Sequence, residues 1–266
     1  MGEYTVKIIV AAHKPYTMPA DPMYLPIHVG AVGKESIGYQ RDDEGENISI
    51  LNPYFCELTG LYWAWKNLPP EDYIGLVHYR RHFGKKTRNP FDGVLTYSEL
   101  QPLLSEYKIF VPQKRKYYIE TLYSHYQHTH YASQLDITRE IIAEKYPDYL
   151  ESYYEVINHT YGYMFNMMIM QRQFLDDYCK WLFDILFELK KRTNLQDLSA
   201  FQSRFYGRVS EIIFNVWMNE QIKSGRIRKS EIKELPYQNM EKINWWKKGT
   251  AFLKAKFFGK RYEESF

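Results

Sequence analysis

Residues 73–83, YIGLVHYRRHF, decide how the rest of the chain is interpreted, because an apolar run leads directly into a cationic cluster. A short apolar run of this kind is typical of a strand buried on both faces of a parallel sheet. His78, Arg80 and Arg81 follow at its carboxyl end, where open α/β sheets bind their ligands. Since the guanidinium group binds phosphate oxygens in pairs, the stretch predicts an α/β fold with an anion site at a strand end.

Three further segments predict buried strands, because each is a short apolar run: residues 5–12, 108–111 and 161–170. The first of them is followed by His13 and Lys14, so the loop after this strand also carries polar and cationic groups. These two residues are candidates for contacting a nucleotide or its phosphates. The alternative is an ordinary solvated loop.

Apolar residues recur at helical spacing in residues 52–68, in residues 174–189 and in a segment that begins near residue 204. Asn52 as N-cap and Pro53 at the first helical position favour a helix start there. Strands and helices alternate up to about residue 240 with no linker or repeat. The pattern therefore predicts one α/β domain over residues 1–240, with a helical C-terminal part, followed by a tail over residues 241–266.

The tail differs from the body of the chain in charge and in aromatic content. Twelve Lys and Arg against three Glu give residues 223–261 a charge of +9, and since the net charge is +3 the remainder carries −6. Residues 243–261, INWWKKGTAFLKAKFFGKR, interleave cations with aromatic anchors, which is typical of a segment that lies on an anionic membrane. The alternative is a C-terminal helix packed on the domain. Nucleic-acid binding is disfavoured, because the basic character is confined to the tail.

The rest of the composition bears on location and on the kind of ligand. Residues 1–10 do not resemble a signal peptide, no run of about 18 apolar residues occurs, and Cys56 and Cys179 are expected to be free thiols. A cytoplasmic protein is therefore expected. Aromatic residues make up 17% of the chain and Tyr dominates with 25 copies, which suits a sugar-binding cleft, a membrane interface or a Tyr-rich core.

Most familiar active-site motifs are missing from the sequence. It contains no phosphate-binding loop, no dinucleotide-binding glycine motif, no nucleophile elbow and no zinc-binding pattern. His125, His128 and His130 suggest a metal site, but at helical spacing only the first two share a face, so structural histidines are favoured. The segment RDDEGEN, residues 41–47, offers Asp42, Asp43 and Asn47 to a ribose, a base edge or a metal, although a turn is the favoured interpretation.

Several strings together resemble one known family. They are YLPIHVG (24–30), DDEGENIS (42–49), NPYFCELTGLY (52–62), LVHYRRHF (76–83) and the segments 161–170, 181–189 and 210–218. The family occurs in bacterial capsular and exopolysaccharide gene clusters and has long been catalogued as a domain of unknown function, with some members described as galactofuranosyltransferases. The resemblance implies a GT-A-like (Rossmann-type) domain and an inverting transferase that uses a UDP-sugar.

In GT-A enzymes the strand end comparable to residue 78 carries an Asp-x-Asp pair that holds a divalent metal. Here cationic side chains stand in that place, so a metal-independent donor site without protein metal ligands is expected. The candidate donor-binding residues are His13, Lys14, Asp42, Asn47, His78, Arg80 and Arg81.

An inverting transferase also needs a general base for the acceptor hydroxyl, and a carboxylate usually fills this role. Glu211 is the first candidate, because it lies on the polar side of an otherwise apolar helix, and Glu57 and Asp43 are alternatives. A surface ion pair with Arg208 is the competing interpretation of Glu211. Candidate acceptor-binding residues are Trp63, Asn166 and Arg208.

Together these expectations describe transfer of a hexose, with galactofuranose as one candidate, from a UDP-sugar to a lipid-linked capsular or exopolysaccharide acceptor. The enzyme would be peripheral to the inner face of the plasma membrane, held there by the tail. A catalytically silent glycan-binding or membrane-binding module of the polysaccharide assembly machinery is the alternative.

Overall fold

A computed structural model describes residues 3–241 and divides the chain into two compact units. Of the described residues, unit 1 comprises residues 3–113, Phe165–Lys180 and Ile227–Glu241, and unit 2 comprises Lys114–Met164 and Trp181–Arg226. The predicted membrane-binding segment, residues 243–261, lies outside the described residues. One domain over residues 1–240 stays a prediction.

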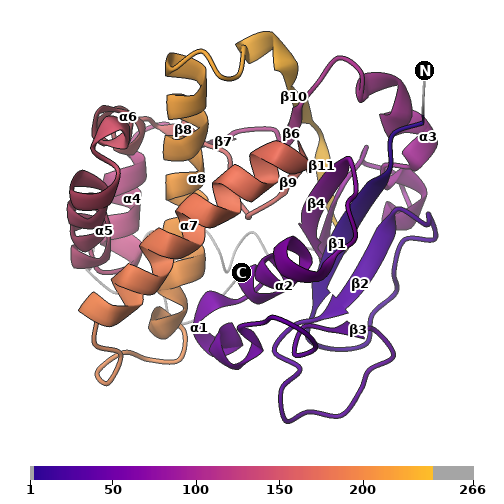
Figure 1. Cartoon of the computed structure of the whole chain (residues 1–266), viewed down its shortest axis with the longest axis horizontal. Coiled ribbons are helices and arrows are strands. Elements are labelled where there is room, and N and C mark those ends of the chain that lie inside the picture. The colour runs from indigo at the N-terminus through magenta and orange to yellow at the C-terminus, as the bar shows by residue number, and fades with distance from the viewer. Residues whose placement is uncertain (1–2, 242–266) are drawn as a thin grey trace. The chain divides into compact units, whose positions relative to one another are not determined.

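Unit 1 is built on a nine-stranded sheet to which all three of its chain segments contribute (Figure 1). Its strands are β1 (Val6–Ala12), β2 (Tyr24–His28), β3 (Gln40–Arg41), β4 (Tyr73–His78), β5 (Arg81–Phe83), β6 (Ile109–Pro112), β9 (Met168–Gln171), β10 (Ile232–Leu235) and β11 (Tyr237–Asn239). The main path runs β10-β6-β9-β4-β1-β2-β3, and β5 and β11 extend from the end of β4.

The strands from β4 to β3 are parallel, whereas β9 runs antiparallel between β4 and β6. Gly75 allows β9 to approach β4, because a Cβ atom at this position would lie 2.9 Å from the carbonyl oxygen of Met168. A mostly parallel sheet with helices confirms the expected α/β class.

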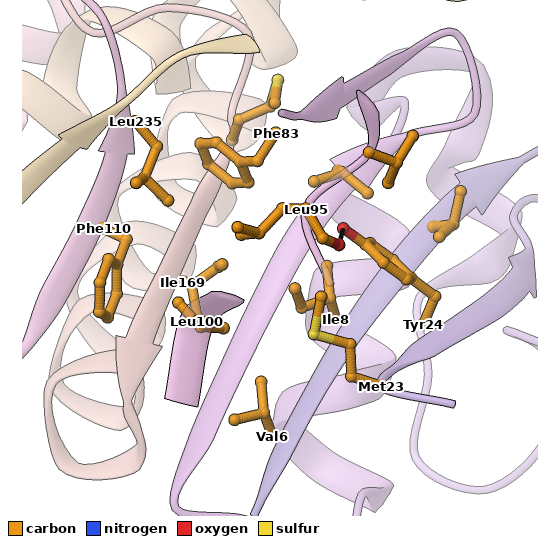
Figure 2. Packing of buried hydrophobic residues seen from close by; sticks show 14 of the residues in the cluster. Val6, Ile8, Met23, Tyr24, Phe83, Leu95, Leu100, Phe110, Ile169 and Leu235 are labelled. Atoms are coloured by element: carbon orange, nitrogen blue, oxygen red, sulfur yellow. Dashed lines mark hydrogen bonds between the residues drawn. The ribbon is translucent and has the colours of Figure 1, made fainter. Parts of the chain in front are cut away.

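The apolar runs that predicted β1 and β4 are buried almost throughout, as central parallel strands must be. Their side chains on one face join a core cluster that includes Ile8, Phe83 and Ile169 (Figure 2). The hydroxyl of Tyr24, which is also part of this cluster, donates a 2.8 Å hydrogen bond to the carbonyl of Leu95. A polar atom is thereby satisfied inside the apolar layer.

The helices of unit 1 are short: α1 (Asn52–Phe55), α2 (Leu58–Asn67), α3 (Tyr97–Leu100) and the first part of α7 (Arg172–Arg192). The single helix predicted for residues 52–68 is wrong, because Cys56 has a φ of 53° and separates α1 from α2. The side-chain amide of Asn52 donates to the carbonyl of Cys56 and to Thr59 Oγ1, which holds the two pieces together across this break.

Unit 2 is mainly helical, with α4 (Leu122–Thr129), α5 (Ser133–Lys145), α6 (Leu150–Ile157), the rest of α7 and α8 (Phe205–Lys223). A two-stranded sheet pairs β7 (Arg115–Lys116) with β8 (Tyr161–Gly162). The predicted strand over residues 161–170 is therefore wrong, because β8 and β9 belong to different sheets. Among the residues that the structure describes, no helix is both long and apolar enough to cross a membrane.

Candidate functional site

The candidate site lies where β1 and β4 end. The chain proceeds from β1 to β2 and β3 on one side, and β4 then pairs with β1 on the other side. Strand order therefore reverses between β1 and β4, and open α/β sheets bind ligands in the crevice beyond the carboxyl ends of such a pair. His13 and Lys14 follow β1, while His78 ends β4, so the sequence-predicted groups meet at this point.

The ring of Tyr79 is the centre around which these groups gather. It is only 2% exposed, and its backbone N–H donates to the carbonyl of Ala11 at the end of β1. The rings of His13 and His78 lie 5.3 and 4.5 Å from its centroid. The sequence analysis did not single out Tyr79, although its position between the cationic residues was a usable signal.

Two full cations complete this group, which we call the Tyr79 cluster: His13, Lys14, His78 and Arg80 around the Tyr79 ring. The Nζ atom of Lys14 and the Cζ atom of Arg80 each lie 5.5 Å from the ring centroid. Both side chains are exposed at their residue positions, so their charged ends can reach a ligand. Cations gathered at the ends of neighbouring strands attract a polyanion and match the oxygens of a diphosphate.

Arg80 lies in a tight turn, whereas Arg81 is the first residue of the strand that follows it. His78 pairs antiparallel with Arg81, so Tyr79 and Arg80 form the connection between β4 and β5. Arg81 Nε donates a 2.9 Å hydrogen bond to Asn239 Oδ1, and its guanidinium carbon lies 3.8 Å from the centroid of the Phe165 ring. These contacts tie Arg81 to β11 and to the segment before β9. Binding of the nucleotide-sugar donor by Arg81 stays a prediction.

His82, which flanks the motif in the sequence, is fully buried and stacks edge-on against Tyr24. It therefore cannot contact a ligand at this edge of the sheet. Burial lowers the pKa of His82 to about 4, because the imidazolium form would lose its hydration.

This depressed pKa predicts a pH-dependent loss of stability. The unfolded chain takes up a proton at His82 as the pH falls from about 6.5 towards 4, whereas the folded chain stays neutral there. Stability present above pH 6.5 is thus lost over this window, by roughly 3 kcal/mol for this one group. Urea unfolding at both ends of the window should show a shallower pH dependence for His82→Leu than for the wild type. Identical slopes would contradict this expectation.

Asp42 is a correction to the predicted donor site. It is 0% exposed, and its carboxylate accepts hydrogen bonds from the backbone N–H groups of Gly30 and Ala31 at 2.8 and 3.0 Å. The hydroxyls of Ser49 and Thr59 donate to the same two oxygens. Gly30 has a φ of 64°, and a Cβ atom there would lie 2.4 Å from Asn52 Oδ1. Asp42 therefore holds the turn after β2 and has no oxygen left for a ligand.

The neighbouring polar residues also build this loop. Arg41 holds Asp43 through two hydrogen bonds of 2.9 and 2.7 Å, and this pairing lowers the pKa of the Asp43 carboxyl. The amide of Asn47 donates to the carbonyls of Asp43 and Gly45. The favoured interpretation of residues 41–47 as a turn agrees with these contacts.

A second polar group lies at the same edge of the sheet. Because β9 runs antiparallel to β4, the residues just before β9 lie at the carboxyl end of β4. Phe165 and Asn166 in this segment have φ values of 79° and 51°. Asn166 Nδ2 donates a 2.7 Å hydrogen bond to Glu57 Oε1, and Glu57 itself follows Cys56, which also has a positive φ. Strained backbone is concentrated at functional sites in proteins, so this group is a candidate part of the site.

The remaining candidates lie elsewhere. Trp63 is buried, and its indole N–H donates to the carbonyl of Glu44, so the prediction that it binds the acceptor is wrong. Glu211 lies in unit 2 and pairs with Arg208 at 3.3 Å, as the competing interpretation held, but it is only 7% exposed and so is not a surface residue.

His125 and His128 form a polar cluster with Glu120 in unit 2, whereas His130 hydrogen-bonds to Thr129 Oγ1. Glu120 is buried and accepts hydrogen bonds from Nδ1 of His125 at 2.7 Å and of His128 at 2.8 Å. Within residues 3–241 no group of three or more His, Cys, Asp or Glu is arranged to hold a metal ion.

Comparison with known proteins places this geometry in context. A family model described as "Domain of unknown function (DUF4422)" matches residues 7–222. Among solved structures, the apo structure of WbbM, described as a bifunctional glycosyltransferase, matches with a TM-score of 0.82 and 28% identity. The match covers 90% of this chain and 46% of WbbM, so the chain spans about half of that protein. It shows the expected GT-A-like fold. No curated protein matches.

Proposed function

We infer that this chain, which belongs to the DUF4422 family, is a glycosyltransferase that binds the diphosphate of a nucleotide sugar between the ends of β1 and β4. The observation that carries the inference is the Tyr79 cluster, which places two imidazoles and two full cations at the topological switch point. The similarity to WbbM supports the same class of activity.

Lys14 and Arg80 are proposed to neutralise the diphosphate as it leaves. When the acceptor oxygen attacks the anomeric carbon, the bond from this carbon to the phosphate oxygen breaks and negative charge develops on the diphosphate. Cations fixed beside that oxygen stabilise the transition state more than the ground state. We propose that these side chains carry out this neutralisation without a metal ion, which the experiment below tests.

Glu57 is proposed as the general base that takes the proton of the acceptor hydroxyl. It belongs to the same unit as the Tyr79 cluster, and Asn166 fixes one of its oxygens. Asp43 is a weaker base, because Arg41 favours its ionised form. Asn166 is then a positioning residue for Glu57. Binding of the acceptor by Arg208 remains a proposal, and the pairing of Arg208 with Glu211 does not support it.

The finer assignments are proposals that rest on the family resemblance. They are a UDP-sugar donor carrying a hexose, with galactofuranose as a candidate, inversion at the anomeric carbon and a lipid-linked capsular or exopolysaccharide acceptor. Such an acceptor would place the protein at the inner face of the plasma membrane.

Calorimetric titration with UDP tests the donor site. We expect Lys14→Ala and Arg80→Ala each to weaken UDP binding by about 10- to 100-fold, because a hydrogen bond to a charged group contributes roughly 1.5–3 kcal/mol. EDTA should leave the affinity of the wild type unchanged.

Arg88→Ala is the matched control, since Arg88 is an exposed arginine of the same unit and its replacement changes the net charge equally. It should retain wild-type affinity. An absence of UDP binding with and without Mn²⁺ would refute the donor site, and binding that disappears in EDTA would refute the metal-free mechanism.

A further inference from the structure

An exposed apolar tip projects from the loop that joins β7 to α4 in unit 2. Tyr118 is 80% exposed and Ile119 is 75% exposed, which makes them the most exposed large hydrophobic residues of the part of the chain that the structure describes. Tyr118 also has a φ of 61°, which is an unfavourable conformation for an aromatic residue. Exposure of two adjacent apolar side chains costs solubility, so this tip requires a physical explanation.

The tip is held firmly at both of its ends. The N–H of Tyr117 donates to the carbonyl of Thr160 at 2.7 Å, and the N–H of Leu122 donates to the carbonyl of His159 at 2.8 Å. Between them Glu120 is 3% exposed and is anchored by two histidines of α4. The apolar side chains are therefore presented by an ordered loop, so little conformational entropy is lost when they bind a partner.

Three consecutive cations precede the tip, at Lys114, Arg115 and Lys116. The Nζ atom of Lys114 lies 4.9 Å from the ring centroid of Tyr161, and the Cζ atom of Arg115 lies 4.7 Å from that of Tyr117. These contacts keep the positive charges next to the tip. We call residues 114–119 the basic loop.

The aromatic rings around the basic loop are already engaged, which argues against a sugar as its partner. Tyr161 has the imidazole of His159 stacked against it at 4.8 Å in addition to the Lys114 cation, and Tyr117 contacts the ring of His125 at 4.4 Å. Tyr118 keeps an exposed ring, but its neighbour Ile119 offers only an aliphatic surface, on which a sugar ring does not stack. An apolar tip beside three cations complements a lipid bilayer with anionic headgroups instead.

We propose that the basic loop is a membrane-contact site, in which Tyr118 and Ile119 enter the headgroup region while Lys114, Arg115 and Lys116 contact anionic lipid phosphates. The site is separate from the proposed contact of residues 243–261, and it does not depend on the glycosyltransferase activity.

Sedimentation of the full chain with phosphatidylcholine vesicles, with and without phosphatidylglycerol, tests the proposal. The double variant Tyr118→Ser, Ile119→Ser should lower the partition coefficient on the anionic vesicles about tenfold, because it removes the apolar side chains that enter the interface. Lys116→Ala should lower the same coefficient about fivefold and change nothing on pure phosphatidylcholine.

Ile50→Ser is the matched control, because Ile50 is 71% exposed and lies in unit 1. It should bind vesicles like the wild type, and residues 243–261 are identical in all of these proteins. UDP affinity, measured on every variant, reports correct folding and separates a failure of this proposal from a failure of the donor site. Unchanged vesicle binding by the double variant would overturn the proposal. If this variant instead lost binding to an oligosaccharide while its vesicle binding stayed intact, the tip would be a sugar-binding site and the proposal would also fail.

Discussion

Glu57→Gln is expected to lower kcat by about 10²- to 10⁴-fold, which is the usual contribution of a general base. The amide cannot take the proton of the acceptor hydroxyl. Its carbonyl oxygen can still accept the hydrogen bond that Asn166 Nδ2 donates to Glu57 Oε1, so the local structure is retained. The rate is measured as the release of UDP from UDP-galactofuranose, either in transfer to a lipid-linked acceptor or in hydrolysis by water.

UDP affinity and the variant Glu211→Gln serve as controls for the loss of kcat in Glu57→Gln. UDP affinity should remain at the wild-type value, because Glu57 is not proposed to contact the diphosphate. Glu211→Gln should keep most of the activity, since Glu211 is 7% exposed and paired with Arg208 in unit 2. If Glu211→Gln abolished turnover while Glu57→Gln did not, Glu211 would be the base, as the sequence first indicated.

Asp42→Ala is expected to lower the free energy of unfolding by about 3–5 kcal/mol, because its carboxylate is the shared acceptor of four buried hydrogen bonds. The substitution leaves two backbone N–H groups and two hydroxyls without their acceptor inside the protein. Each buried donor that loses its partner costs roughly 1–3 kcal/mol, and partial relaxation of the loop reduces the total. Urea unfolding monitored by circular dichroism gives the value.

Asp43→Ala is the control, because it removes the same charge from the next residue. Its carboxylate pairs with Arg41 near the surface, and surface ion pairs contribute about 0–1 kcal/mol. The two substitutions should therefore differ by several kcal/mol although the sequence presents the two residues alike. Equal destabilisation would mean that the hydrogen bonds to Asp42 do not hold the turn after β2.

The sequence predicted those parts of the fold that a short stretch of residues specifies by itself, through an apolar run or a helical periodicity. β1 and β4 are short apolar runs, and their burial on both faces leaves little ambiguity about the kind of sheet. α7 and α8 carry a long apolar periodicity. The polar residues after β1 and β4 could be assigned to one edge because parallel strands end together, and the Tyr79 cluster lies at that edge.

The errors arose where distant contacts determine the conformation. Cys56 breaks a helix whose periodicity is continuous, and the positive φ values of Phe165 and Asn166 divide one apolar run between two sheets. Cys and Phe rarely adopt a left-handed backbone, so their sequence positions give no warning of it, and only Asn166 is of a residue type that favours it. Asp42 and Asp43 differ in burial because of residues such as Thr59, 17 positions from Asp42, which no local pattern could reveal.

The pairing of β10 with β6 has a consequence for the order in which the protein is made. Ile232 lies beside Ile109 in the sheet, so more than a hundred residues must leave the ribosome before this edge of β6 is covered. β11 follows immediately, and the N–H of Met240 donates to the carbonyl of Arg80. The turn that bears the proposed donor-binding arginine therefore acquires this backbone support only after β10 and β11 have been synthesised. A nascent chain that stops before β10 exposes an unpaired strand edge, which is a site for aggregation.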